Sequence, residues 1–164
     1  RSVEAGLRVN MTLCFSQEQA AAVYAATKGT KSPAYVSPFV GRLDDIGQHG
    51  VDLLANIKRM FAQSDGHAHI LAASVRSLEQ LLYCFHIQTE LATVPTKVLE
   101  QWAAKDFPTP GPDFSYTSTG TPIAYKDLDL ERPFKSLDIE QELTRKGIAR
   151  FVSDYRATLT YSGL

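Results

Sequence analysis

The sequence predicts an α/β fold built on a parallel sheet. Apolar runs with the character of β-strands alternate with runs of helical periodicity, four times within roughly the first hundred residues. No turn sequence typical of a β-hairpin joins two strands directly, which favours crossover connections and parallel pairing. Polar side chains gather at the same end of three consecutive strands, where parallel α/β proteins present their chemistry.

The composition indicates one domain in a reducing compartment. The 164 residues are enough for a real core, and the net charge of −1 comes from interspersed acidic and basic side chains, without a basic face for nucleic acid. No apolar run has the length of a bilayer span and no leader pattern is present, so we expect a soluble, cytoplasmic protein without a membrane partner. Cys14 and Cys84 lack the spacing of metal ligands, and we expect buried thiols, with no metal and no cofactor.

The first unit and the second strand are marked by clear signals. Residues 9–15 have strand character, and Ser16 is a predicted N-cap with Gln19 at the capping-box position. An alanine-rich helix follows and ends near Gly29. The second predicted strand, 35–40, leads into a turn that contains arginine and two aspartates.

Helical and strand patterns continue after this turn. Apolar residues recur at helical spacing from Val51 to Phe61, and Pro95 marks the start of a later helix. The remaining predicted elements are a loop at 41–50, a strand at 69–74, a helix at 78–85 and a strand at 87–92.

The last third of the chain has a different character. Residues 107–125 are rich in proline, glycine, serine and threonine, and Asp138 is a predicted N-cap with Gln141 three residues later. The final helix is amphipathic, so we expect it to pack on the rest of the protein. The predicted organisation is therefore four βα units in 1–106, an irregular covering segment in 107–137 and a packed C-terminal helix in 138–164.

Polar residues at the strand ends predict a lined pocket. Asn10 and Thr12 share one parity of the first strand, Ser37 and Phe39 one parity of the second, and Ser74 lies at the end of the third. Buried polar groups cost free energy unless they bond to each other or to a ligand. Each of them can also be an ordinary satisfied core hydroxyl or amide, which is the usual case for a single buried serine or threonine.

Two arginines follow the second and third strands. Arg42 and Arg76 each come two or three residues after a strand end, and a guanidinium group matches phosphate oxygens with two parallel hydrogen bonds. The pattern favours a phosphorylated small molecule at this edge. The alternative is a pair of surface arginines bound to Asp44, Asp45 or Glu79.

Three segments resemble a known enzyme family. Residues 10–16, 37–42 (Ser-Pro-Phe-Val-Gly-Arg) and 73–76 are similar, in this order and spacing, to the fifth, sixth and seventh strands of the transaldolase family. The family has a class I aldolase-like (β/α)8 fold. The resemblance covers about the first hundred residues and implies the C-terminal half of a TIM barrel, with parallel strands 5–8 and their helices, plus a C-terminal helical extension.

The resemblance also implies a role for each site residue. Asn10 and Thr12 would form the floor of the active site, with Thr12 ordering a catalytic water, and Ser37 would hydrogen-bond the bound donor. Phe39 is typical of transaldolases, whereas the similar fructose-6-phosphate aldolases carry tyrosine there. The positions that match the family's phosphate-binding residues are Arg42, Ser74 and Arg76.

The family's chemistry needs a lysine that this chain does not place on a strand. That lysine lies on the fourth strand of the family's barrel and forms a Schiff base with the ketose donor. This chain is expected to start after the fourth strand. The resemblance therefore implies a fragment of a transaldolase of the pentose phosphate pathway. The fragment would be inactive by itself, and the complete enzyme would move a dihydroxyacetone unit between sugar phosphates.

The alternatives are a fructose-6-phosphate aldolase-like enzyme and a non-catalytic half-barrel that binds sugar phosphates. We expect the N-terminal half of the barrel as partner, on the same polypeptide or a separate chain, and homo-oligomers are possible.

Overall fold

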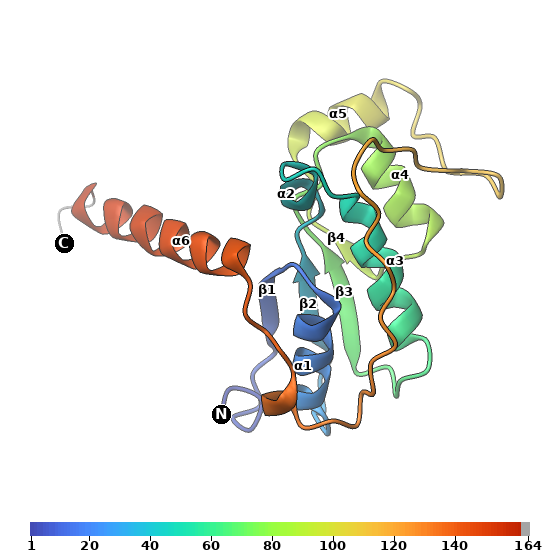
Figure 1. Cartoon of the computed structure of the whole chain (residues 1–164). Helices are drawn as coiled ribbons and strands as arrows, with labels where there is room; N and C mark the ends of the chain where they lie inside the picture. The colour runs from blue at the N-terminus through green and yellow to red at the C-terminus, as the bar shows by residue number, and fades with distance from the viewer. Residues whose placement is uncertain (162–164) are drawn as a thin grey trace.

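The computed structural model describes residues 1–161, which form a four-stranded parallel sheet in the order β1-β2-β3-β4. The predicted parallel α/β class is confirmed by this topology; closure into half of a barrel stays a prediction. Helices α1 (Gln17–Thr27) and α3 (Gly50–Phe61) lie together in front of the sheet in Figure 1. Among residues 1–161, no helix is both long and apolar enough to cross a bilayer.

The two faces of the sheet differ in character. Val36 of β2 (Ala34–Pro38) pairs with Ile70 of β3 (Ala68–Ala72), and both are buried among the helix side chains of the core. The adjacent pair, Tyr35 and His69, points to the other face and is only half-buried. Side chains alternate along a strand, so the helices cover one face while the other carries polar and aromatic groups.

The predicted start of the first helix is confirmed. Strand β1 (Asn10–Cys14) leads to Ser16, whose hydroxyl accepts a hydrogen bond from the Gln19 N–H at 3.2 Å. The Gln19 side chain does not accept a hydrogen bond from the N–H of Ser16, as it would in a complete capping box. Its Oε1 instead accepts from the N–H of Phe15 at 2.7 Å, which ties the end of β1 to α1.

The second strand is shorter than predicted, and the predicted loop 41–50 begins as a helix. Helix α2 (Val40–Asp44) starts where the N–H groups of Val40 and Gly41 donate to carbonyls at the end of the β3 unit. The chain turns at Phe39 and enters one helical turn, too short for its periodicity to be recognised. The Oδ1 of Asp44 then accepts from the N–H of Gly50, the first residue of α3, at 2.8 Å.

The fourth strand is also shorter than predicted. Helix α4 (Leu78–His86) precedes β4 (Leu91–Ala92), and the predicted strand residues 87–90 form a turn in which Gln88 has a φ of 55°. The carboxylate of Glu90 accepts a hydrogen bond from the N–H of Ile70 at 2.9 Å. A side-chain carboxylate therefore accepts from a backbone N–H of β3 that the backbone of a longer β4 would otherwise have bound. Helix α5 (Thr96–Ala103) follows Pro95, as expected.

Residues 107–137 form an extended segment with one short 3-10 helix, η1 (Phe134–Ser136). The segment runs along α3 and then passes to α1 (Figure 1). The Nδ2 of Asn56 donates to the carbonyl of Ile123 at 2.8 Å, and Gln17 exchanges two hydrogen bonds with the backbone of Lys126.

Helix α6 (Glu142–Tyr161) starts four residues later than predicted. Asp138 is not its N-cap, because its Oδ1 accepts from the N–H of Glu140 in a separate turn before the helix. The helix contacts β1 near its start and then projects away from the sheet, with the apolar residues Phe151 and Val152 more than 40% exposed (Figure 1). Packing along its length therefore stays a prediction, and residues 162–164 of the predicted helix lie outside the described residues.

Candidate site at the C-terminal ends of the strands

A bulge in β1 changes the predicted pattern of side chains. Met11 pairs with Val36, the register then shifts, and Leu13 adopts a left-handed φ of 57°. Leu13 and Cys14 are consecutive and both buried, whereas Thr12 is exposed. The expected alternation along β1 is therefore interrupted after Met11 by a bulge, and the role of Thr12 in the site stays a prediction.

Asn10 and Ser37, two of the predicted site residues, are joined by a hydrogen bond. The Ser37 hydroxyl donates to Oδ1 of Asn10 at 2.8 Å. Asn10 pairs in register with Tyr35, so both polar side chains lie on the face of the sheet away from the helices. Ser37 is almost fully buried, and this hydrogen bond satisfies its donor.

Phe39 and Arg42 lie together after the end of β2. The Arg42 guanidinium carbon is 5.4 Å from the centroid of the Phe39 ring, within the range of a cation–π contact. Phe39 also makes an edge-to-face contact with Phe15, with the ring centroids 5.8 Å apart. Within residues 1–161, no carboxylate oxygen lies within 4.0 Å of the Arg42 guanidinium, so its charge has no direct counter-ion there.

Arg76 is held differently, by Asp45. Its Nη2 donates to Oδ2 of Asp45 at 2.8 Å, and its Nη1 donates to Oδ1 of the same carboxylate. The hydrogen bonds from Arg76 hold the pKa of Asp45 below its usual value. The alternative in which the arginines bind neighbouring carboxylates is therefore observed for Arg76. Within residues 1–161 it is not observed for Arg42.

The segments that follow β2 and β3 lie very close to each other at Gly41. Its N–H donates to the carbonyl of Ser74 at 3.1 Å, and Ser74 itself has a left-handed φ of 59°. A Cβ atom at Gly41 would lie 2.4 Å from that carbonyl oxygen and 2.6 Å from Nε of Arg76. The absence of a side chain at Gly41 therefore brings the Arg42 and Arg76 segments to the same edge of the sheet.

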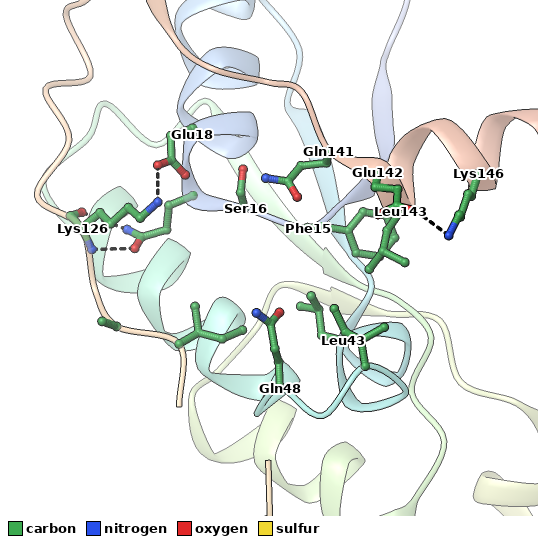
Figure 2. A pocket seen from close by; sticks show the side chains of 14 residues that line it. Phe15, Ser16, Glu18, Leu43, Gln48, Lys126, Gln141, Glu142, Leu143 and Lys146 are labelled. Carbon is green, nitrogen blue, oxygen red and sulfur yellow. Dashed lines mark hydrogen bonds and ion pairs between the residues drawn. The ribbon is translucent and has the colours of Figure 1, made fainter. Parts of the chain in front are cut away.

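A separate cavity of about 380 Å3 lies next to this edge. Figure 2 shows two ion pairs among its lining residues: Lys126 with Glu18 at 2.5 Å, and Lys146 with Glu142 at 2.6 Å. Phe15 lines this cavity and also contacts Phe39. None of the seven predicted site residues is among its lining residues, so it is distinct from the predicted site.

Two residues of α6 reach the site and were not predicted. The ring centroid of Phe151 is 5.8 Å from the Arg42 guanidinium carbon, and Gly147 packs against Leu13 and Arg42. The amphipathic pattern indicated that this helix packs on something. It gave no signal that Arg42 is the contact.

The eight lysines of the chain all lie outside β1–β4. Lys58 of α3, for example, pairs with Glu90 at 2.6 Å and is partly exposed. The others are Lys28, Lys31, Lys97, Lys105, Lys126, Lys135 and Lys146.

These features define an α/β protein with a polar, guanidinium-bearing site at the C-terminal ends of parallel strands. The model of the transaldolase/fructose-6-phosphate aldolase family matches residues 2–161. The chain belongs to this family, as the resemblance of its strand segments indicated.

Curated relatives match only part of the chain. A probable transaldolase of Exiguobacterium sp. (strain AT1b) is 45% identical over 98 residues, which cover 60% of this chain and 43% of the relative. A probable transaldolase of Clostridioides difficile (strain 630) is 45% identical over 96 residues, covering 58% and 42%. One of Bacteroides thetaiotaomicron is 42% identical over 97 residues, covering 59% and 42%. The chain therefore spans less than half the length of these relatives.

Proposed function

We propose that this chain supplies the sugar-phosphate-binding part of a transaldolase. The complete enzyme would transfer a dihydroxyacetone unit between sugar phosphates through a Schiff base, on a lysine outside this chain. Family membership and the relatives named as probable transaldolases support the activity, and the partial coverage of those relatives supports a contribution from elsewhere.

The positions of the lysines support an external nucleophile. A Schiff-base lysine reacts as a free amine, which requires a desolvated position that lowers its pKa. Lys58 does not occupy such a position, because it is partly exposed on α3 and its ammonium group donates to the Glu90 carboxylate and to the Gln88 carbonyl, both at 2.6 Å. This chain alone is therefore proposed to be inactive.

One observation carries the phosphate-binding proposal: among residues 1–161, no carboxylate forms a direct ion pair with the Arg42 guanidinium, which lies beyond the C-terminal end of β2. A guanidinium group that contacts two aromatic rings and forms no direct ion pair in this part of the chain can donate hydrogen bonds to an anionic oxygen. Ser74 and Arg76 lie across the Gly41 contact and would complete the phosphate site, provided that Arg76 leaves Asp45.

The polar pair below this edge is proposed to contact the sugar. The Ser37 hydroxyl already donates to Asn10, so its oxygen lone pairs remain able to accept a hydrogen bond from a donor hydroxyl. Thr12 is proposed to order water only if the complete barrel encloses it, because in this chain it is exposed.

The free edge of β1 is proposed to receive the N-terminal half of the barrel. In the described sheet β1 pairs on one side only, with β2. A largely apolar groove of about 400 Å3 lies on its other side, lined by Met11, Thr12, Val23 and Ile148 among others. An unpaired edge and an apolar groove next to each other favour a further strand and helix at this position.

Two alternative functions remain open. A fructose-6-phosphate aldolase would release free dihydroxyacetone, and Phe39 argues against it, because those enzymes carry tyrosine at the matching position. A non-catalytic half-barrel that binds sugar phosphates is supported by the lysine positions. It would bind without turnover even when combined with a partner chain.

Binding of fructose 6-phosphate, with fructose as reference, tests the phosphate-binding proposal. We expect the chain to prefer the phosphorylated sugar, and Arg42→Gln to reduce that affinity by about tenfold or more, because charged hydrogen bonds are lost. Arg8→Gln, the same charge change in an exposed residue before β1, is the control and should have little effect. Equal affinity of the wild type and Arg42→Gln would refute the proposal.

A further inference from the structure

The guanidinium of Arg42 lies near two aromatic rings from distant parts of the chain. Its central carbon is 5.4 Å from the centroid of Phe39, which follows β2, and 5.8 Å from the centroid of Phe151, on α6. A guanidinium within about 6 Å of an aromatic centroid is attracted by the ring. Two rings together limit the directions in which the side chain can swing.

A glycine allows α6 to come this close. A Cβ atom at Gly147 would lie 2.6 Å from Cδ2 of Leu13 and 3.2 Å from Nη1 of Arg42. Gly147 is buried, although most of the helix around it is exposed. Glycine disfavours the interior of a helix, so its presence here fits a need for close approach.

The start of α6 is fixed by hydrogen bonds to the first βα unit. The Thr144 hydroxyl donates to the carbonyl of Leu13 at 2.9 Å and accepts from Nε2 of Gln19 at 2.9 Å. The same Gln19 side chain accepts from the N–H of Phe15. One connected set of hydrogen bonds therefore links the bulge in β1, helix α1 and the first turn of α6, and places Phe151 two turns further along.

We propose that Phe151 is a positioning residue for Arg42, and that α6 arranges the anion site through it. The two rings restrain the guanidinium group, while no carboxylate of residues 1–161 binds it directly. An arginine that is already ordered loses less conformational freedom when it binds an anion, so the affinity for that anion rises. This inference rests on the proposed role of Arg42 in phosphate binding.

Phosphate binding by the 164-residue chain tests the inference, with inorganic phosphate as probe. The affinity is measured by titration, and the Arg42 Nε–H signal is followed by NMR, because nearby rings shift it. We expect Phe151→Leu to lower the affinity roughly two- to fivefold, as loss of one cation–π contact predicts, and to move the Arg42 signal. Phe151→Tyr keeps the ring and should retain both. Val152→Ala, a truncation of the exposed neighbour on the same helix, should change neither.

The outcomes separate the inference from the proposed function. If Arg42→Gln weakens phosphate binding and Phe151→Leu does not, Phe151 has no positioning role and the phosphate role of Arg42 stands. Equal losses for Phe151→Leu and Val152→Ala would also overturn the inference, because the effect would then belong to the helix as a whole. If Arg42→Gln leaves binding unchanged, the phosphate role fails, and the positioning role fails with it.

Discussion

Arg76 and Asp45 form a bidentate ion pair at the edge of the sheet. The distance between Nη2 of Arg76 and Oδ2 of Asp45 is 2.8 Å. Arg42, on the same edge, has no such partner within the described residues. The two arginines therefore differ: the Arg76 guanidinium is bound to a carboxylate, and under the proposed phosphate role it would have to leave Asp45 first, whereas Arg42 would not. Asp45 therefore competes with any phosphate for Arg76.

Asp45→Asn is predicted to raise the phosphate affinity of the chain. An exposed ion pair contributes about 0.2–1 kcal/mol, so releasing Arg76 should improve binding by at most about fivefold. Titration with inorganic phosphate measures this, and the gain should disappear in Asp45→Asn with Arg76→Gln. A gain that persists in the double variant would show that the lost negative charge, and not Arg76, is responsible.

The pKa of Asp45 gives a prediction on pH. The hydrogen bonds from Arg76 lower this pKa in the folded protein. The ionised Asp45 carboxylate therefore contributes to the free energy of unfolding. This contribution is fully present at a pH above the unfolded-state pKa of about 3.9, and it is lost as the pH falls through the lower folded-state pKa. Because the pair is about half exposed, the contribution to stability should be small.

NMR titration of the Asp45 carboxyl carbon checks this prediction. Its midpoint should lie below about 3.9 in the wild type and move upward in Arg76→Gln. A midpoint that is the same in both proteins would contradict the ion pair in solution.

Gly41→Ala is predicted to destabilise the fold and disturb the site. The new Cβ atom would meet the Ser74 carbonyl oxygen at 2.4 Å, a backbone atom that cannot move away cheaply. Overpacking of this kind typically costs about 1–3 kcal/mol in the free energy of unfolding. Denaturant unfolding measures the loss, with Gly111→Ala as the control, because a Cβ atom there meets nothing within 4 Å. Equal stability of the two variants would contradict the close approach of α2 to β3.

Both thiols are predicted to be unreactive in the folded protein. Burial raises the pKa of Cys14 to about 12 and that of Cys84 to about 11. Since the thiolate is the reactive form, iodoacetamide at pH 8 should leave both side chains unmodified in native protein and alkylate both after unfolding. Intact mass reports the modification. Rapid alkylation of native protein would contradict the burial of these cysteines.

Much of the fold follows from local signals in the sequence. Ser16 caps α1 as predicted, and period-2 alternation places Tyr35 and Ser37 on one face and Val36 on the other. Helix α2 was missed because a single turn leaves no periodic pattern. The predicted strand at 87–90 failed because the carboxylate of Glu90, a side chain, bonds to β3 at that position.

The site was predictable where it depends on strand register. Parallel pairing and the parity of each strand place Asn10 and Ser37 on the same face of the sheet, and the structure adds the hydrogen bond between them. The exposure of Thr12 could not be predicted, because a bulge at Leu13 cannot be recognised from alternation alone. The contact between Arg42 and Phe151 joins residues that are far apart in the sequence, and only the folded chain brings them together.

The central claim is that this chain contributes a sugar-phosphate site to a reaction whose lysine lies elsewhere. Incubation with fructose 6-phosphate, reduction with borohydride and intact-mass analysis test it most directly, because reduction traps a lysine-bound imine. The account predicts no adduct on this chain, and a trapped adduct on a longer polypeptide or companion chain that completes the barrel. A stoichiometric adduct on this chain would contradict the account.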